Sequence, residues 1–401
     1  MTKKLYENNA LLKSCLAVVT NCQEDKGKYL VELDQTVFFP EGGGQLSDRG
    51  KLGVAQVSYV GEKDGHIYHH CDQPLEVGSE VEAVLDWQVR LDRMQQHCGE
   101  HILSYACWKL FQANNVGFHM HENLVTIDLD KALTDEELAQ AELLTNEIIW
   151  ENRPIHIDYM DSSEAAALAD KMRKFNSKLQ GLLRIVTVED ADICTCCGTH
   201  PPFTGMVGSV KIIRHEKHKT GCRVEFLCGQ RALKDAAEKN ALVLRIANGF
   251  SCKAEQVEEH LHKQEEEIAG LKDRLNKLMA KVLETQLADS LEQAPTCANG
   301  ARLLVMALTE GDGKESKQLL QKVTALENTV SLLVMVQPAR ISYVVALSAG
   351  AAGNCQQYIR LVNEAFGGRG GGKPDLAQGG SNYCPDWQER LNLVKEKILG
   401  M

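Results

Sequence analysis

The sequence lacks any long run of apolar residues. No stretch approaches the roughly 18 to 20 consecutive apolar residues of a membrane-spanning helix. The start of the chain, residues 1–9, contains two lysines but lacks the apolar segment of a secretory leader. We therefore expect a protein that neither crosses a membrane nor is secreted, and we expect it in the cytoplasm.

The sequence also lacks a net positive charge. Its formal net charge is −11 at pH 7, which argues against indiscriminate binding to nucleic acids, because phosphate backbones attract basic surfaces. A local patch can still contact RNA. One stretch groups five cations with two histidines: Lys211, Arg214, Lys217, Lys219 and Arg223 with His215 and His218. The patch predicts either an RNA contact or a solvated hairpin whose outer positions carry charge.

What the chain does contain is typical of a soluble, folded, multidomain protein. Hydrophobic residues make up 44% and charged residues 25% of its 401 residues. A chain of this length should hold about two or three domains. Its 14 cysteines, in a protein that we expect not to be exported, predict reduced thiols with a few metal ligands and no disulfide framework.

The first half of the chain predicts a β domain followed by an α+β domain. Residues 1–88 contain partly alternating segments, such as 29–33 and 54–60, which predict a β-barrel or sandwich. Across 89–245, apolar residues first recur at helical spacing and strands follow, which predicts helices packed on an antiparallel sheet. A capping box at 134–137 opens the second of these helices.

The second half predicts a helical spacer and a small α/β domain. Heptad spacing over 254–284 favours a coiled coil or helical hairpin within a spacer at 250–292. The heptad positions are Val257, Leu261, Gln264, Ile268, Leu271, Leu275, Leu278 and Val282. Residues 296–401 then alternate strand-like and helical segments. We therefore expect an α+β multidomain chain with an N-terminal β-barrel, a zinc-bearing α+β core, the spacer and a glycine-rich C-terminal α/β domain.

Two short clusters carry the strongest chemical signal. His97 and His101 lie four residues apart on a predicted helix, so both imidazoles share one face. Cys196 and His200 have the same separation on a glycine-containing turn. Together they form a His, His, Cys and His set that suits tetrahedral Zn²⁺. Other cysteines close by leave the cysteine ligand open, although the four-residue step to His200 favours Cys196.

The first cluster lacks the residue order of a zinc protease. Those enzymes place a glutamate general base directly after the first histidine. Here Glu100 directly precedes His101. Adjacent helix positions point about 100° apart, so we expect Glu100 to project away from the cluster. This order disfavours a metalloprotease.

The glycine-rich run lacks the last residue of a phosphate-binding P-loop. Residues 367–373 match the spacing up to the lysine, but Pro374 replaces the Ser or Thr that would meet Mg²⁺. Nucleotide hydrolysis is therefore disfavoured. Backbone N–H groups beside Arg369 and Lys373 can still cradle an RNA phosphate, with a flexible surface loop as the alternative.

Taken in order, the motifs resemble those of the alanyl-tRNA synthetase editing domain and of the freestanding AlaX proteins. They are Phe-Phe-Pro-Glu-Gly-Gly-Gly-Gln at 38–45, the two histidines of the first cluster, and Cys-Cys-Gly-Thr-His at 196–200. The heptad segment and the glycine-rich C-terminal domain resemble the tail of the synthetase and of the long AlaX form. The resemblance implies a zinc-assisted hydrolase that deacylates mischarged tRNA(Ala), chiefly when it carries serine, with glycine as a second error.

The resemblance also implies roles for single residues. The zinc ligands would be His97, His101, Cys196 and His200. Of these, His97 and His101 would belong to the catalytic centre. Gln45 would make a polar contact near the aminoacyl group or the ribose, and Gly43 and Gly44 would let the substrate approach closely. Cys197 stands where the synthetase motif commonly has glycine.

Selection of serine over the smaller alanine requires a group that uses the serine hydroxyl, because size exclusion cannot reject a smaller side chain. His119 or Thr126 is the candidate for that contact, although Thr126 can equally be an ordinary strand residue. No residue stands out as a general base. Four protein ligands would leave no open position on Zn²⁺, so the ion would organise the site unless one ligand is loose.

Two other functions fit part of the sequence. A non-catalytic tRNA-binding protein with a structural zinc would bind without turnover, and a hydrolase of another activated ester would not need tRNA identity. The glycine-glutamine segment together with the four ligands favours the trans-editing hydrolase. Because the barrel begins within the first few dozen residues, we expect no amino-acid activation and an ATP-independent reaction. A homodimer through the coiled coil or the C-terminal domain stays open beside packing within one chain.

Overall fold

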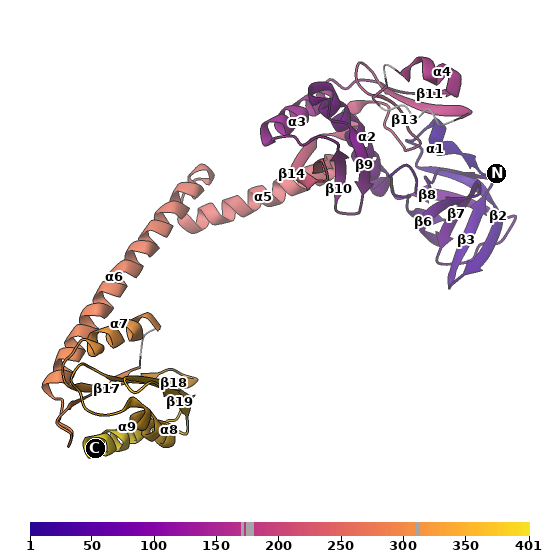
Figure 1. Ribbon diagram of the computed structural model, residues 1–401. Helices are drawn as coiled ribbons and strands as arrows, with labels where there is room; N and C mark the ends of the chain where they lie inside the picture. Colours follow the sequence, from indigo (N-terminus) through magenta and orange to yellow (C-terminus); the bar gives the residue numbers. More distant parts are fainter. Residues whose placement is uncertain (170–171, 174–179, 310–312) are drawn as a thin grey trace. The chain divides into compact units, whose positions relative to one another are not determined.

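The computed structural model describes four stretches of the chain: residues 1–169, 172–173, 180–309 and 313–401. They divide into two compact units, Met1–Gly249 (unit 1) and Phe250–Met401 (unit 2), as coloured along the chain in Figure 1. Among the described residues, no helix has both the length and the apolar content needed to cross a membrane. The prediction of a multidomain chain that mixes helices and sheets is confirmed.

Unit 1 begins with six strands that close into a barrel. In barrel order they are β2 (Ser14–Asp25), β3 (Lys28–Leu33), β7 (His66–Cys71), β6 (Ala55–Lys63), β5 (Gly50–Leu52) and β8 (Glu80–Leu85). Successive side chains of a strand point to opposite faces, so residues such as Val31 and Val60 fill the barrel core while their neighbours face outward. Outside the barrel, α1 (Leu5–Asn8) follows β1 (Lys3–Lys4), which pairs in parallel with β4 (Gln35–Thr36).

Two helices and a four-stranded antiparallel sheet follow the barrel. The sheet order is β14 (Val210–His218), β15 (Gly221–Cys228), β10 (Val125–Leu129) and β9 (Asn115–Met120). Helix α2 (Trp87–Phe111) begins after Asp86, whose carboxylate accepts hydrogen bonds from two backbone amides of the first turn. Helix α3 (Asp135–Trp150) begins with the capping box of Thr134 and Glu137, which confirms that prediction. Helices and sheet share one buried core.

A three-stranded sheet carries the cysteine cluster. Its neighbouring antiparallel strands are β11 (Ile155–Asp161), β12 (Leu182–Val188) and β13 (Ile193–Thr195). Helix α4 (Ser162–Ala167) directly follows β11. After β13 the chain forms the Cys-Cys-Gly-Thr-His turn and a short 3-10 helix, η2 (Thr204–Val207), before it enters β14. Helix α5 (Gly229–Phe250) follows β15.

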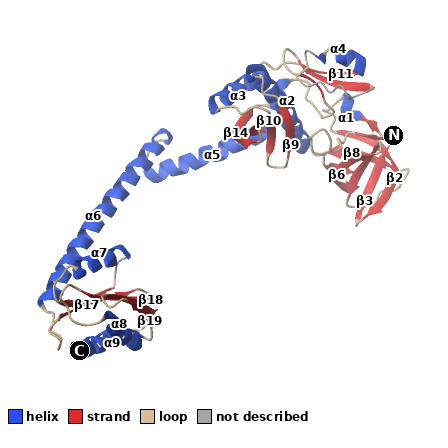
Figure 2. Ribbon diagram, viewed as in Figure 1, coloured by secondary structure: helices blue, strands red, loops and turns tan. Residues whose placement is uncertain are grey.

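Unit 2 combines a long helix with an α/β domain. The short η3 (Ala254–Gln256) leads into α6 (Val257–Glu292), which covers the predicted heptad segment (Figure 2). The sheet order is β16 (Arg302–Leu308), β17 (Thr329–Val336), β18 (Arg340–Leu347), β20 (Leu376–Asn382) and β19 (Arg369–Gly372). Helix α7 (Gly313–Thr324) and the end of α6 cover one face of the sheet, and α8 (Cys355–Phe366) and α9 (Trp387–Leu399) cover the other.

The glycine-rich run forms an edge strand and not an open loop. Gly367 ends α8 in the left-handed region at φ 63°, and β19 then pairs antiparallel with β20. A Cβ on Gly370 would lie 2.3 Å from the Gln378 carbonyl oxygen, so glycine is needed for this close approach of two strands. Arg369 is the first residue of β19 and Lys373 follows its last residue, and both are exposed.

Candidate metal centre

Helix α2 presents two buried imidazoles one turn apart. His97 is 2% exposed and His101 is 5% exposed. The helix lies close to the sheet at this point, because a Cβ on Gly99 would lie 2.3 Å from the Cys228 sulfur. The glycine between the histidines therefore lets α2 lie against β15, and this packing fixes where both rings point.

The turn after β13 brings the other two candidate ligands, and contacts from both sides hold it. Gln45 is buried in the loop between β4 and β5, which we call the barrel loop. Its amide oxygen accepts a hydrogen bond from the Thr199 backbone N–H at 2.9 Å, and its amide nitrogen donates one to the Thr199 hydroxyl at 2.8 Å. On the other side, the Arg184 guanidinium donates to the carbonyls of Cys196 and Gly198 at 2.7 and 3.0 Å. A Cβ on Gly198 would lie 2.5 Å from His97 Nε2, so only glycine fits between them.

The four side chains converge on one point. One ligand atom each from His97, His101, Cys196 and His200 lies within 4.8 Å of all the others. The Cys196 sulfur lies 3.0 Å from His97 Nε2 and 3.4 Å from His200 Nε2. Among the cysteines left open by the sequence, Cys196 is the one in this group, whereas Cys197 is exposed.

The protonation states in this cluster fit a bound cation. Burial works against the Cys196 thiolate, but the positive charges of His97 and His101 hold the pKa of this thiol well below its usual range. Burial also lowers the pKa of His200 to about 3, so its imidazole is neutral at pH 7. The Cys196 thiolate and the neutral His200 imidazole are forms that bind metal ions. Burial opposes the charge on His101, but the charges of Cys194 and Cys196 raise its pKa, so His101 would release a proton when an ion binds. The residues therefore form a Cys/His cluster that can bind a metal ion.

A buried carboxylate orients the second histidine. His101 Nδ1 lies 3.1 Å from Asp192 Oδ2 and 3.0 Å from the Cys194 sulfur, so its Nε2 faces the cluster. Burial opposes ionisation of Asp192, but the charge of Arg173 and the bond from His101 hold its pKa well below its usual range. Carboxylate–histidine pairs of this kind fix the ring and its tautomer in metal sites.

A cavity of about 260 Å³ opens beside the cluster. Besides cluster residues, its wall includes Gly43, Glu100, Asn115, Phe118, Arg173 and Thr195. The expectation that Glu100 projects away from the cluster is wrong: its Oε2 lies 3.8 Å from His101 Nε2. A glutamate side chain is long enough to turn back along the helix, so the 100° step between backbone positions did not decide its direction.

Several residues of the site escaped the sequence analysis. Glu100 stood inside the first motif, and Asp192, Cys194 and Cys196 occupy alternate positions along one extended segment. Alternate residues of a strand share a face, so this spacing could have placed Asp192 beside the ligands. No local signal pointed to Arg173, which reaches Asp192 from a separate segment of the chain.

The glycines of the barrel loop lie near the second cluster. Gly43 lines the cavity, and the place of a Cβ on it would be 4.0 Å from the Gly198 nitrogen. Gly44 has φ 82°, and a Cβ there would lie 2.6 Å from the Phe118 ring. Gln45 is near the cluster too, but both ends of its amide already bond to Thr199. Its contact with a substrate stays a prediction.

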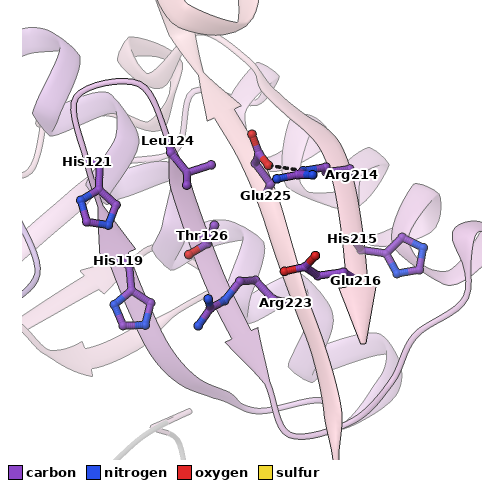
Figure 3. A pocket seen from close by; sticks show the side chains of 9 residues that line it. All are labelled: His119, His121, Leu124, Thr126, Arg214, His215, Glu216, Arg223 and Glu225. Carbon is purple, nitrogen blue, oxygen red and sulfur yellow. Dashed lines mark hydrogen bonds and ion pairs between the residues drawn. The ribbon is translucent and has the colours of Figure 1, made fainter. Parts of the chain in front are cut away.

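His119 and Thr126 do not line the metal-centre cavity. They are cross-strand neighbours on β9 and β10, and their chain neighbours Phe118 and Ile127 belong to the core packing on the opposite face of the sheet. Both instead line a separate pocket of about 250 Å³ on the outer face of the sheet. Figure 3 shows this pocket, whose lining residues are His119, His121, Leu124, Thr126, Arg214, His215, Glu216, Arg223 and Glu225.

The predicted cationic patch lies partly along this outer pocket, and carboxylates pair with most of its charges. Arg214 bonds to Glu225 at 2.6 Å and Arg223 bonds to Asp128 at 2.6 and 2.8 Å. Lys211 bonds to a carboxylate of α3 at 2.7 Å. These ion pairs leave the hairpin with little excess positive charge. The two C-terminal cations that the sequence singled out belong to unit 2.

Comparisons with known proteins place these features among tRNA-editing proteins. Residues 183–225 match the domain described as "Threonyl and Alanyl tRNA synthetase second additional domain". The alanyl-tRNA editing protein AlaX-L of Pyrococcus horikoshii is 28% identical over 412 residues, which cover 99% of this chain and 98% of that protein. The putative alanyl-tRNA editing protein alaX of Saccharomyces cerevisiae is 29% identical over 330 residues, with 71% of each protein covered.

A longer relative matches the whole of this chain. The alanine–tRNA ligase of Thermococcus kodakarensis is 30% identical over 423 residues, which cover 100% of this chain and 44% of the ligase. The chain thus spans less than half of that ligase but nearly all of AlaX-L. Over nearly its whole length, the chain therefore resembles the long form of the freestanding alanyl-tRNA editing proteins, the AlaX family, and the matching part of alanine–tRNA ligases.

Proposed function

We propose that this protein hydrolyses the ester bond of mischarged tRNA(Ala), as a freestanding editing enzyme. One observation carries the proposal: a buried Cys/His cluster opens onto a cavity of about 260 Å³ in a chain that resembles AlaX-L over 99% of its length. An aminoacyl ester is already activated, so a site that holds it beside a water molecule needs to supply only modest assistance.

We propose Zn²⁺ as the ion of the cluster. Three imidazoles and one thiolate are a donor set that zinc commonly takes, and the protonation states of Cys196 and His200 fit it. The ion would be held by His97, His101, Cys196 and His200. When bound, Zn²⁺ can polarise the ester carbonyl or orient a water molecule.

The chain's own residues would prepare the site for this reaction. Gln45 holds the Cys-Gly-Thr-His turn against the barrel loop, so it positions two of the ligands. Gly43 would let the substrate approach the backbone closely at the cavity wall. The ring of Phe118 lies 5.7 Å from that of His97 and forms an apolar part of the cavity wall.

We propose serine as the main amino acid removed, with glycine as a second. A polar side chain in the cavity wall can form a hydrogen bond with the serine hydroxyl. Alanine has no hydroxyl and would leave that side chain without a partner. Asn115 and Thr195 line the metal-centre cavity and are candidates for this contact, whereas His119 and Thr126 line the other pocket. Arg369 and Lys373 would contact tRNA phosphates from the edge of the unit 2 sheet.

The test is deacylation of Ser-, Gly- and Ala-tRNA(Ala) by the wild type and by His97→Ala, with the zinc content measured in parallel. We expect fast loss of serine, slower loss of glycine, retention of alanine, and no activity in the zinc-poor variant. Tight binding of tRNA(Ala) without turnover by zinc-replete wild type would instead support a non-catalytic tRNA-binding protein. Four protein ligands on one ion are typical of structural zinc sites, and this ligand set favours the second function.

We also propose a homodimer that forms through α6. Leu271, Leu275 and Leu278 are 53%, 59% and 59% exposed, although they occupy heptad positions that bury apolar side chains in coiled coils. In a parallel pair, Gln264 of one copy would face Gln264 of the other, and Glu267 would lie near Lys272 of the other copy, five positions further along. The exposed apolar side chains at the heptad positions of α6 therefore favour packing against a second copy of the chain.

We propose a cytoplasmic location. All 14 cysteines are free thiols, including those that lie buried in the barrel, in the α+β core and in unit 2. Free thiols in such number persist in a reducing compartment.

A further inference from the structure

Glu100 is a buried carboxylate that the proposed reaction does not yet use. It is 5% exposed and lies on α2 directly before His101. Its Oε1 accepts hydrogen bonds from Ser104 Oγ at 2.7 Å and from Asn115 Nδ2 at 2.6 Å. Asn115 is itself held, because its Oδ1 accepts from the Gly117 N–H at 2.9 Å. One side of the carboxylate is therefore fixed by neighbours that donate to it.

The other oxygen of Glu100 faces the cavity without a cationic side chain of its own. Among the described residues, the cation nearest to Oε2 is His101 Nε2 at 3.8 Å, which is the nitrogen that faces the metal cluster. The charge of the nearby Arg173 acts on Glu100 from a distance, but its guanidinium bonds to both oxygens of Asp192, at 2.9 and 3.3 Å. Arg173 and the ion proposed for the cluster would act on Glu100 from nearby, but neither donates a hydrogen bond to Oε2, so a cationic N–H group that enters the cavity can be its direct partner.

The place of this oxygen limits what that cation can be. Glu100 lines the same cavity as His97, Cys196 and Gly43, so any partner must lie beside the metal cluster. In an aminoacyl ester the α-ammonium group is two bonds from the carbonyl carbon that water attacks. A carboxylate beside the cluster therefore stands within reach of the ammonium when the ester carbonyl is at the cluster.

We propose that Glu100 Oε2 binds the α-ammonium group of the aminoacyl ester and thereby selects esters with a free amino group. The inference rests on the proposed function and names a recognition contact for its substrate. Acylation of the amino group removes its positive charge, so N-acylated esters would leave Glu100 buried and unpaired. The site would then spare N-acetylated and peptidyl esters of the same tRNA.

The first experiment compares Ser-tRNA(Ala) with N-acetyl-Ser-tRNA(Ala), using the wild type, Glu100→Gln and Glu136→Gln. Glutamine has the shape of glutamate and can still accept from Ser104 and Asn115. Glu136 is exposed on the first turn of α3 and serves as the matched control. We expect kcat/KM of the wild type for the free amino ester to exceed that for the acetylated one by about 30- to 150-fold. Glu100→Gln should lose that preference and keep its zinc, and Glu136→Gln should match the wild type.

The second experiment measures binding without turnover, by calorimetry with 3′-serylamido-3′-deoxyadenosine and with the same compound lacking its amino group. The wild type should bind the amino compound about 30- to 150-fold more tightly, and Glu100→Gln should bind the two alike. This comparison stands even if the variant loses zinc, because the wild type alone reports the preference for the ammonium group. It also separates the two proposals, since binding selectivity can persist in a protein that does not hydrolyse Ser-tRNA(Ala).

Two results would overturn the role of Glu100. An unchanged preference for the free amino ester in zinc-replete Glu100→Gln would reduce Glu100 to a structural partner of Ser104 and Asn115. An equal loss of activity toward the free amino ester and the acetylated ester in that variant would assign Glu100 to another part of the substrate, such as the serine hydroxyl.

Discussion

At the scale of single residues, the metal centre depends on side chains that are not ligands. Asp192 is buried beside His101 and is held as a carboxylate by Arg173. This pair points His101 Nε2 at the cluster. The contribution of Asp192 should therefore appear in the affinity for the metal and, through its buried ion pair with Arg173, in the stability of the fold.

Asp192→Asn should weaken zinc binding by about 10- to 100-fold, because an amide orients the His101 ring less strongly than a carboxylate does. Competition with a chromophoric chelator measures this affinity directly. Asp158→Asn, at an exposed position of β11, is the matched control and should leave the affinity unchanged. Equal affinities for Asp192→Asn and the wild type would show that His101 needs no carboxylate partner.

His69 should make the barrel sensitive to acid. Burial lowers its pKa from 6.5 to about 4, and its ring bonds to Thr36 Oγ1 and to the Val31 carbonyl. Below pH 6.5, His69 binds a proton in the unfolded chain but stays neutral in the folded one. Its contribution to the free energy of unfolding is therefore fully present above pH 6.5 and is lost as the pH falls toward 4. The free energy of unfolding should drop by about 2 kcal/mol from this group between pH 7 and pH 5.

Urea unfolding at the two pH values measures that drop, and His69→Gln supplies the comparison. Glutamine does not titrate, so the pH dependence of the variant should be smaller than that of the wild type by the contribution of His69. His66→Gln, at an exposed position of β7, is the control and should keep most of the wild-type dependence. The same slope in all three proteins would contradict the assignment.

At the scale of elements, one hydrogen-bonded amide joins the barrel loop to the turn that carries two of the candidate ligands. Gln45 and Thr199 are 154 residues apart in the chain and exchange two hydrogen bonds in a buried place. Gln45→Ala would leave the Thr199 backbone N–H and hydroxyl unpaired. We expect a loss of about 1–3 kcal/mol in the free energy of unfolding, together with weaker zinc binding.

Chemical denaturation and zinc titration of Gln45→Ala test this coupling, with Gln56→Ala at an exposed position of β6 as the control. The same data separate two roles for Gln45. A loss of stability and metal affinity indicates that it positions the turn. A normal zinc affinity and stability with a raised KM would instead indicate the direct substrate contact that the sequence predicted.

The exposed heptad stripe of α6 leads to a prediction about assembly. Leu271→Asp places a charge at the centre of the proposed dimer contact, whereas Asn276→Asp adds the same charge on another face of the helix. Sedimentation equilibrium should find the wild type and Asn276→Asp as dimers and Leu271→Asp as a monomer. A monomeric wild type at micromolar concentration would rule the contact out.

At the scale of the whole molecule, the metal centre belongs to unit 1 and the glycine-rich edge strand to unit 2. The proposed recognition of tRNA and the proposed hydrolysis of its ester can therefore be tested separately. The net charge of −11 makes local cations the main source of affinity for RNA.

Arg369→Ala combined with Lys373→Ala should weaken tRNA(Ala) binding and leave the zinc content unchanged. Loss of two phosphate contacts should reduce the slope of log affinity against log salt by about 1.5. Filter binding across a salt series measures that slope, with Lys397→Ala in the last turn of α9 as the control. An unchanged slope would remove these two cations from the RNA contact.

The sequence could predict those parts of the candidate site that depend on the spacing of neighbouring residues in the chain. Steps of four residues placed His97 with His101, and Cys196 with His200, because a helix turn and a tight turn are decided by neighbours in the chain. The capping box at Thr134 followed the same logic. For the same reason, the heptads predicted helical structure over 254–284, as a coiled coil or a helical hairpin, and the structure has a single helix, α6, over most of that segment.

Only the tertiary structure decided which distant residues meet. Glu100 turns toward the cluster because Asn115 of β9 holds it there, and Gln45 is occupied because the turn after β13 packs on the barrel loop. His119 and Thr126 lie on the outer face because pairing of β9 with β10 sets which side chains enter the core. The sequence by itself determined the two pairs of candidate ligands, because the four-residue spacing within each pair is local. The meeting of the two pairs and the wall of the cavity beside them come from contacts between segments far apart in the chain, which no local spacing encodes.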